Sequence, residues 1–403
     1  MTRRVMIRVG PSDGVPSLRP LPSSALMTEP DLAAAWGALV DDLRTAGERV
    51  AASAAELDPL EQADAYRALV RALNNQLGRF EVDRDRPELV PFNGWREKFL
   101  MDNPDFRYWV ADIRPDRRYR IVGNVGDAVY TSITAYAAGG VAQAAASARI
   151  DSDALEIGDD GSFSVLLVPE SDGDDEAEVG AAAAGESLLR LPEAASAVWV
   201  RQFHDDAADD TLGWCRIEPL DDVPPPPVSE PARLGHQLAR LGQTMARFPR
   251  IVDAAVAPDL AAPNEVRHWE EMTGGAAFTE PAIHYVRGAW QLGEGEALVI
   301  DGVLPACRYW NVLLYSRHLN SLDFRHRRVS RTAASSTVVD GRYRFVIAAT
   351  DPRVGDWLDS EGREFGIFVL RFLHPVSTPE LPTVERLAIA DLADRGVGDG
   401  GRS

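Results

Sequence analysis

The sequence predicts an α+β fold that is mainly β, with an N-terminal helical hairpin followed by two related antiparallel β-sandwich halves of jelly-roll-like character. Apolar residues recur at helical spacing only near the N-terminus and once in the middle of the chain. Elsewhere, short apolar runs alternate with turn-forming residues, without the regular succession of strands and helices that a parallel sheet requires. The strand pattern also occurs twice along the chain.

A chain of 403 residues is long enough for two or three compact units. The clearest boundary is the stretch DDVPPPP, because consecutive prolines form a stiff extended helix that interrupts regular secondary structure. The predicted segments are a flexible tail (1–28), the helical hairpin (29–92), the first β-sandwich half (93–222), a proline linker with a connecting helix (223–280), the second β-sandwich half (281–390) and a disordered tail (391–403).

The helical hairpin is predicted from two amphipathic patterns. The first begins near Leu32, and the second begins at Asp58, whose side chain can cap the free amides of the first turn. Pro59 suits that first turn, and Glu61 can close a capping box. Two helices of this length bury little core by themselves, so we expect them to pack on another element. The connecting helix is expected to end near Pro249.

Ten apolar runs are predicted to be strands, five in each half. They cover residues 119–123, 129–136, 162–168, 198–204 and 212–220, then 283–287, 296–300, 308–315, 343–349 and 365–373. The acidic, small-residue stretch 170–186 between two of these runs is predicted to be a loop.

The two halves match in order, which indicates an internal duplication. By subtraction of residue numbers, three matched segments are offset by 179, 179 and 180 residues, and the segment 198–204 matches 368–374 at an offset of 170. Chance similarity between strand sequences is the alternative explanation. The turn-rich insert DPRVGDWLDSEG at 351–362 shows no counterpart in the first half, where the acidic loop occurs instead.

Composition excludes several classes of function. The chain has 42 basic and 62 acidic residues, a net charge of -20, which disfavours nucleic acid and anionic membranes as partners. No apolar run reaches the ~18 residues of a membrane span, and the N-terminus lacks the apolar core of a signal peptide, so a soluble cytoplasmic protein is expected. Cys215 and Cys307 have neither zinc-site nor redox-pair spacing and are expected to be buried free thiols.

The sequence contains no motif for a cofactor or a metal. Neither glycine-rich phosphate-binding loop occurs, and the seven histidines show no H-x-x-x-H or H-E-x-x-H spacing, so we predict no cofactor and no metal site. The basic run RHRR at 325–328 has the chemistry to bind a carboxylate or a phosphate. On so acidic a chain, an ion-pairing loop is the simpler interpretation.

The insert at 351–362 carries the candidate catalytic residues. Asp351, Asp359 and Glu361 lie between two strand-like runs, where a pair of carboxyl groups can supply a general acid and a general base. The neighbouring Trp357 can stack on a flat ring. The same residue types are also those that turns require, so a purely structural role is the alternative.

Five motifs together resemble the family known as domain of unknown function 1214, particularly its long actinobacterial-type members. They are DNPDFRYWV, YRIVGN, EALVIDGVLPACRYWNVLLYS, DPRVGDWLDSEG and GIFVLRFLHP, and the resemblance extends over about residues 31–387. It implies a β-sandwich of jelly-roll character with added helices, in a family without an assigned reaction. By this resemblance the following residues occupy motif positions: Asp102, Asn103, Asp105, Tyr119, Arg120, Gly123, Trp310, Asp351, Trp357, Asp359 and Arg371.

The leading hypothesis is that the chain binds a small, partly apolar molecule in a cleft between the turn around Trp357 and the DNPD segment. The predicted ligand-binding residues are Asp102, Asn103, Asp105, Tyr108, Trp310, Trp357 and Arg371. One alternative is an enzyme that uses Asp351, Asp359 and Glu361 for hydrolytic or acid–base chemistry. Another is a structural protein that forms homo-oligomers through the edges of its sandwiches.

Overall fold

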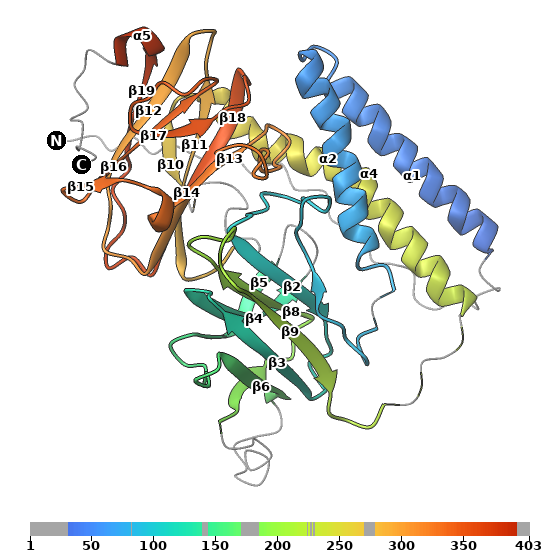
Figure 1. Cartoon of the computed structure of the whole chain (residues 1–403). Coiled ribbons are helices and arrows are strands. Elements are labelled where there is room, and N and C mark those ends of the chain that lie inside the picture. Colours follow the sequence, from blue (N-terminus) through green and yellow to red (C-terminus); the bar gives the residue numbers. More distant parts are fainter. Residues whose placement is uncertain are drawn as a thin grey trace, which may run out of the picture.

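The computed structural model describes residues 31–81, 83–138, 144–170, 185–223, 225, 228, 230–269 and 279–392. The fold is α+β and mainly β, as predicted, with a pair of N-terminal helices and largely antiparallel sheets (Figure 1). The predicted flexible tail, most of the predicted acidic loop and most of the predicted disordered tail lie outside the described residues. The last tail was predicted to begin at residue 391, but residues 391 and 392 belong to α5 (Ile389–Leu392).

The predicted hairpin consists of α1 (Leu32–Ser53) and α2 (Pro59–Leu77). Asp58 caps α2 as expected, because its Oδ1 accepts hydrogen bonds from the amides of Leu60 at 2.8 Å and Glu61 at 3.1 Å. The Glu61 side chain, predicted to close a capping box, instead forms an ion pair with Arg363 at 2.6 Å. A contact 302 residues away in the sequence therefore replaces a local one.

The connecting helix α4 (Pro231–Ala261) does not end near Pro249 but continues through Pro249 and Pro258. A proline inside a helix removes one backbone hydrogen bond and costs roughly 3 kcal/mol. Here Pro249 is buried, and Phe248, Val252 and Val256 belong to the largest core. Packing therefore outweighs the local preference. α1 lies along α4, and the three long helices form one layer beside the two sandwiches (Figure 1).

The first half contains two sheets. One has the order β1 (Val90–Pro91), β2 (Phe106–Asp112), β8 (Ala197–Phe203), β4 (Tyr130–Ala138) and β5 (Ala144–Asp151). The other has the order β7 (Ser187–Leu191), β6 (Ser162–Pro169), β3 (Tyr119–Gly126) and β9 (Leu212–Pro219). Apolar side chains of both sheets, such as Ile133 and Val165, share one core.

The second half also contains two sheets. One has the order β10 (Val266–His268), β11 (Ile283–Gln291), β18 (Phe365–Leu373), β13 (Tyr309–Tyr315) and β14 (Ser330–Thr332). The other has the order β15 (Val338–Val339), β16 (Arg342–Ala348), β12 (Glu296–Val303) and β19 (Thr383–Ala388), with β17 (Asp356–Asp359) beside β16. Their shared core also includes residues of α4.

The two halves follow one pairing scheme. The order β2-β8-β4 in the first half equals β11-β18-β13 in the second, and β6-β3-β9 equals β16-β12-β19. The insert at 351–362, predicted to have no counterpart in the first half, contains a strand that does have one. Its strand β17 pairs parallel with β16, just as β7 pairs parallel with β6. Strands of four or five residues carry too little pattern to be found from sequence.

The halves pack against each other through an aromatic cluster. Phe106, Tyr130 and Phe203 come from the first half, and Ile283, Tyr309 and Leu373 come from the second. The rings of Phe106 and Phe203 stack at 3.9 Å between centroids. In the part of the chain that the structure describes, no helix is long and apolar enough to cross a membrane.

Candidate functional site

The contact between the halves brings together two Tyr–Arg pairs from corresponding strand positions. Tyr108 on β2 lies opposite Arg201 on β8, and Tyr285 on β11 lies opposite Arg371 on β18. The Arg371 guanidinium is 5.7 Å from the centroid of the Tyr285 ring. Both arginines are close enough to Tyr108 to lower the pKa of its hydroxyl, against the larger effect of burial. We call these four residues the Tyr–Arg site.

Each half supplies a polar segment to the other half at this site. Glu280, just before β11, reaches into the first half, where its carboxylate accepts a hydrogen bond from Ser132 at 2.8 Å and pairs with Arg201 at 3.2 Å. Asp105, just before β2, reaches into the second half, where it accepts a hydrogen bond from Asn311 Nδ2 at 2.9 Å. The Tyr–Arg site is therefore assembled by the packing of the two sandwiches.

The two arginines differ in charge compensation. Arg201 has Glu280 as its counter-ion, whereas Arg371 is 5% exposed and has no carboxylate within 4.0 Å among the described residues. Arg371 donates one hydrogen bond, from Nη2 to the Tyr315 hydroxyl at 2.6 Å, and its Nη1 has no partner in the same set of residues. The residue placed like Glu280, five positions before the tyrosine, is the neutral Asn103. A buried, uncompensated cation is energetically costly and therefore marks a functional candidate.

Asp105 is an acidic group near Arg371. Burial raises the pKa of its carboxyl to about 6, although hydrogen bonds from Asn311 and Ser330 and the charge of Arg371 act in the opposite direction. The carboxyl group is therefore partly protonated near neutral pH, and it neutralises Arg371 only in part.

The Tyr108 hydroxyl is a free hydrogen-bonding group. It forms no hydrogen bond with any residue that the structure describes, and its side chain keeps partial solvent exposure. Burial raises the pKa of this hydroxyl well above its usual value, so the phenol stays protonated and can donate. With Arg201 and Arg371 nearby, it can donate to an anionic oxygen.

Five of the predicted ligand-binding residues lie in or beside this region: Asp102, Asn103, Asp105, Tyr108 and Arg371. Asp102 has a supporting role, because its carboxylate accepts hydrogen bonds from the amide and the hydroxyl of Ser321 at 2.8 and 2.6 Å. These contacts attach the DNPD segment to the loop that follows β13.

The two predicted tryptophans lie elsewhere. Trp310 packs in the core of the second half, with its ring centroid 5.9 Å from that of Phe345 and 6.3 Å from that of Tyr343. Trp357 donates its indole N–H to the carbonyl of Ala348 at 3.0 Å and packs on a separate cluster that includes Val346. The rings of both tryptophans are therefore engaged outside the Tyr–Arg site.

The candidate catalytic carboxylates of the insert are held by backbone amides and by an arginine. Asp351 accepts a hydrogen bond from the amide of Arg353 at 2.8 Å. Asp359 pairs with Arg327 at 2.8 Å and accepts the amide of Glu361 at the same distance. Glu361 accepts the amide of Asp323 at 2.6 Å. The contacts of Asp351 and Asp359 with amides two residues further on stabilise turns, and Glu361 joins the insert to the loop at Asp323.

Sequence reasoning missed Arg201, Glu280 and Tyr285. The matched segments 198–204 and 368–374 place Arg201 opposite Arg371 in the duplication, so that signal was present. No local pattern marks Tyr285 or Glu280. Among the described residues, no group of three or more His, Cys, Asp or Glu side chains is placed to hold a metal ion.

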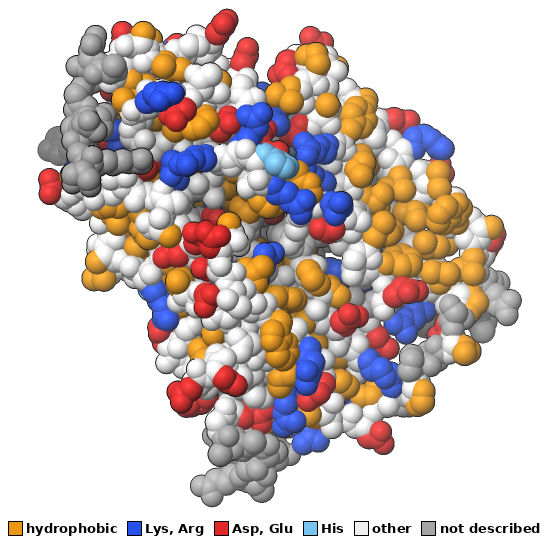
Figure 2. Space-filling view, in the orientation of Figure 1, with side chains coloured by type: hydrophobic (Ala, Val, Ile, Leu, Met, Phe, Trp, Pro, Cys, Tyr) orange, Lys and Arg blue, Asp and Glu red, His pale blue; other side chains and the backbone are white. Residues whose placement is uncertain are grey.

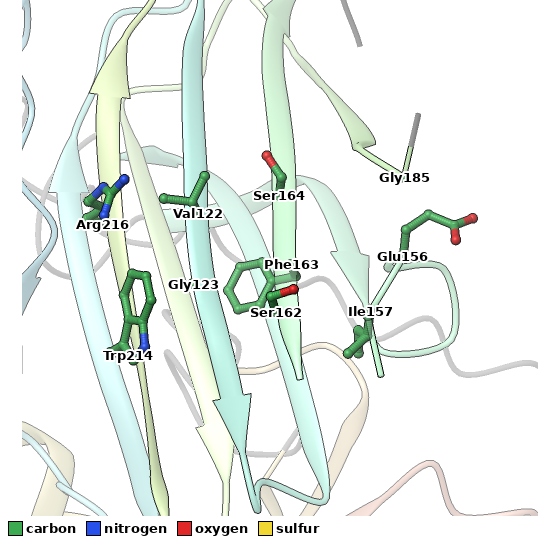
Figure 3. A pocket seen from close by; sticks show the side chains of 11 residues that line it. Val122, Gly123, Glu156, Ile157, Ser162, Phe163, Ser164, Gly185, Trp214 and Arg216 are labelled. Atoms are coloured by element: carbon green, nitrogen blue, oxygen red, sulfur yellow. The ribbon is translucent and has the colours of Figure 1, made fainter. Parts of the chain in front are cut away.

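A separate open groove of about 470 Å³ lies on the outer face of β6, β3 and β9 (Figure 3). Its walls include Trp214, Arg216, Phe163 and Ile157. The groove contains none of the predicted ligand-binding residues, and it belongs to the first half alone.

Comparison with known proteins gives one informative match. No family model matches the chain, and no curated protein matches it. Its structure is similar to that of an uncharacterized protein from Burkholderia cenocepacia, with 26% sequence identity and a TM-score of 0.80 over 90% of this chain and 99% of that chain. A protein from Vibrio parahaemolyticus is 12% identical, with a TM-score of 0.44 over 80% of this chain and 97% of that chain. The fold is thus shared with another protein over nearly its whole length.

Proposed function

We propose that the chain binds a small, partly apolar molecule with an anionic group, such as a carboxylate, at the Tyr–Arg site. The observation that carries this proposal is the buried guanidinium of Arg371, which has no carboxylate partner in the described chain. An anionic ligand would supply the missing charge. The free Tyr108 hydroxyl would donate directly to it, and the rings of Tyr108 and Tyr285 would contact its apolar part.

This proposal keeps part of the sequence hypothesis and relocates the ligand. Asp105, Tyr108 and Arg371 remain ligand-site residues, whereas Trp310 and Trp357 have their rings engaged in other clusters. The charge of Arg371, which has no carboxylate partner in the described chain, also narrows the ligand class from a partly apolar molecule to a partly apolar anion.

Acid–base catalysis is a second candidate function, and Asp105 is the observation that favours it. A carboxyl group with a pKa of about 6 can both accept and release a proton near neutral pH. Enzymatic activity therefore rests more naturally on Asp105 than on Asp351, Asp359 and Glu361, whose carboxylates are engaged by backbone amides.

We also propose membership of the domain of unknown function 1214 family and an origin of the two halves by internal duplication of a jelly-roll-like sandwich. The shared pairing scheme supports the duplication, including the parallel pairs β6-β7 and β16-β17. The Tyr–Arg pairs at equivalent positions support it as well. An association of copies through the sandwich edges stays a separate hypothesis.

Titration calorimetry with benzoate, phenylacetate, butyrate and hexanoate, each beside its neutral amide, tests the proposed function. We expect the carboxylates to bind and the amides not to bind. Tyr108→Phe keeps the ring and removes the donor, so carboxylate affinity should fall at least about tenfold, because a hydrogen bond to a charged group contributes about 1.5–3 kcal/mol.

Tyr343→Phe is the matched control, since the Tyr343 hydroxyl is buried in the second half without a hydrogen-bond partner in the described chain. Equal binding by the parent and Tyr108→Phe would refute the proposed site. Absence of binding by every carboxylate would refute the proposed ligand class.

A further inference from the structure

Four cationic side chains surround one indole ring at the junction of α2 with the second half. Arg67 and Arg71 of α2 lie 5.9 and 5.4 Å from the centroid of the Trp95 ring. Lys98 lies 4.6 Å and Arg325 lies 4.9 Å from the same centroid. Cations are attracted to the face of an indole, which explains how the ring can hold them close together. We call these five residues the Trp95 patch.

None of the four cations forms an ion pair with a carboxylate in the part of the chain that the structure describes. The nearby acids have other partners. Asp323 accepts hydrogen bonds from the His326 ring at 3.0 Å and from the Arg325 amide at 3.1 Å. Asp102 is held by the amide of Ser321. The Trp95 patch therefore carries an excess of positive charge.

The pKa values of the patch agree with that excess. Burial lowers the pKa of Arg71, and the charge of Arg67 lowers it further, while Asp64, Asp102 and Asp323 act in the opposite direction. Burial likewise lowers the pKa of Lys98 to about 8, with Arg71 and Arg67 contributing in the same direction and Asp102 opposing them. These cations repel one another, and a bound anion would remove the repulsion.

The patch is open to solvent on one side. Arg67 and Arg325 are exposed and Trp95 is half-buried. Figure 2 shows basic side chains gathered around a histidine over the junction of α2 with the loop that follows β13. The chain has a net charge of -20, so this cluster is a local reversal of its overall sign. The basic run at 325–328 is only partly an ion-pairing loop, because Arg327 pairs with Asp359 but Arg325 faces Trp95.

We propose that the Trp95 patch binds the phosphate group of a small molecule, at a site separate from the Tyr–Arg site. A carboxylate brings a single negative charge, whereas a phosphate monoester brings about 1.5 to 2 near pH 7 and three acceptor oxygens. Two exposed arginines match these oxygens with planar, forked donors. Trp95 holds the cations in place, and its ring is already covered by them, so it orients the site and does not stack on the ligand.

Titration calorimetry of the full chain with inorganic phosphate and with pyrophosphate at low salt tests this inference. We expect both probes to bind, pyrophosphate more tightly, and acetate to bind at least about tenfold more weakly. Arg67→Ala and Arg325→Ala should each weaken pyrophosphate binding about tenfold or more. Both side chains are exposed, so the variants should fold.

Arg96→Ala is the matched control, because Arg96 is exposed beside Trp95 in sequence but is not among the cations over its ring. Binding unaffected by Arg67→Ala and Arg325→Ala, an equal loss in Arg96→Ala, or no binding of either probe would overturn the inference. Tyr108→Phe should bind pyrophosphate like the parent, so failure of this site and failure of the Tyr–Arg site are distinguishable.

Discussion

Burial and hydrogen bonding shift the pKa of the Asp105 carboxyl group in opposite directions. Removal from water favours the protonated form, while the donors Asn311 and Ser330 favour the charged form. Burial prevails, because the pKa rises from 3.8 to about 6. The residue that joins the start of β2 to the second half is therefore sensitive to pH near neutrality.

Asp105→Asn should change how stability depends on pH. Between 3.8 and about 6 the folded chain binds more protons at this residue than the unfolded chain, so Asp105 makes the parent less stable as pH rises through that window. The loss is about 3 kcal/mol, at 1.36 kcal/mol per pKa unit. Urea unfolding of parent and variant at several pH values across this window should show their free energies of unfolding diverging in favour of the variant. A constant difference would contradict the raised pKa.

At the scale of elements, β11 and β18 fit together through reciprocal glycine–aromatic pairs. Trp290 lies opposite Gly366, and Phe368 lies opposite Gly288. A Cβ atom built on Gly366 would overlap the Trp290 ring, and one on Gly288 would overlap the Phe368 ring. Each glycine therefore provides the space for a large ring of the neighbouring strand.

Gly366→Ala should destabilise the fold by about 1–3 kcal/mol, since overpacking forces neighbours to shift. The Trp290 side chain is fully buried and donates its N–H to the carbonyl of Arg363, so it cannot move aside. Gly47→Ala in α1 is the control, because a methyl group there meets nothing within 4 Å and should stabilise the helix by about 0.5–1 kcal/mol. Urea unfolding measures both effects, and two changes of the same sign would contradict this account.

At the scale of the whole molecule, buried charges attach the helical layer to the second sandwich. Arg363 pairs with Glu61 at 2.6 Å, with Asp64 at 3.5 Å and with Glu361 at 3.2 Å. Glu61 also lies 3.3 Å from Arg317. Burial raises the pKa of Glu61 despite these cations. These ion pairs hold α2 in place only while the arginines and the acidic side chains are both present and charged.

Arg363→Ala should lower the free energy of unfolding by roughly 3–5 kcal/mol, because it leaves two acidic side chains buried with reduced compensation. Arg386→Ala, which removes the exposed pair with Glu296 at 3.7 Å, should cost at most about 1 kcal/mol. Chemical denaturation of the two variants beside the parent measures the difference. Similar losses in both would mean that the buried cluster contributes no more than an ordinary surface pair.

The sequence by itself determined the features that depend on neighbouring residues. The period of apolar residues and the chemistry of turns are local, so the strand at 365–373 was predicted to the residue and the Asp58 cap was correct. The order of the segments, the match between the halves and five of the residues around the Tyr–Arg site also followed from sequence, through motif resemblance and the repeated strand pattern.

Only the tertiary structure decided which of these residues meet. Tyr108 and Tyr285 are 177 positions apart by subtraction, and their encounter depends on how two sandwiches pack. Packing also carries α4 through Pro249 and engages the Trp357 ring in a cluster with Val346. Burial, charge compensation and contact depend on atoms distant in the chain, so no local pattern encodes that Arg371 would be buried without a carboxylate partner in the described chain.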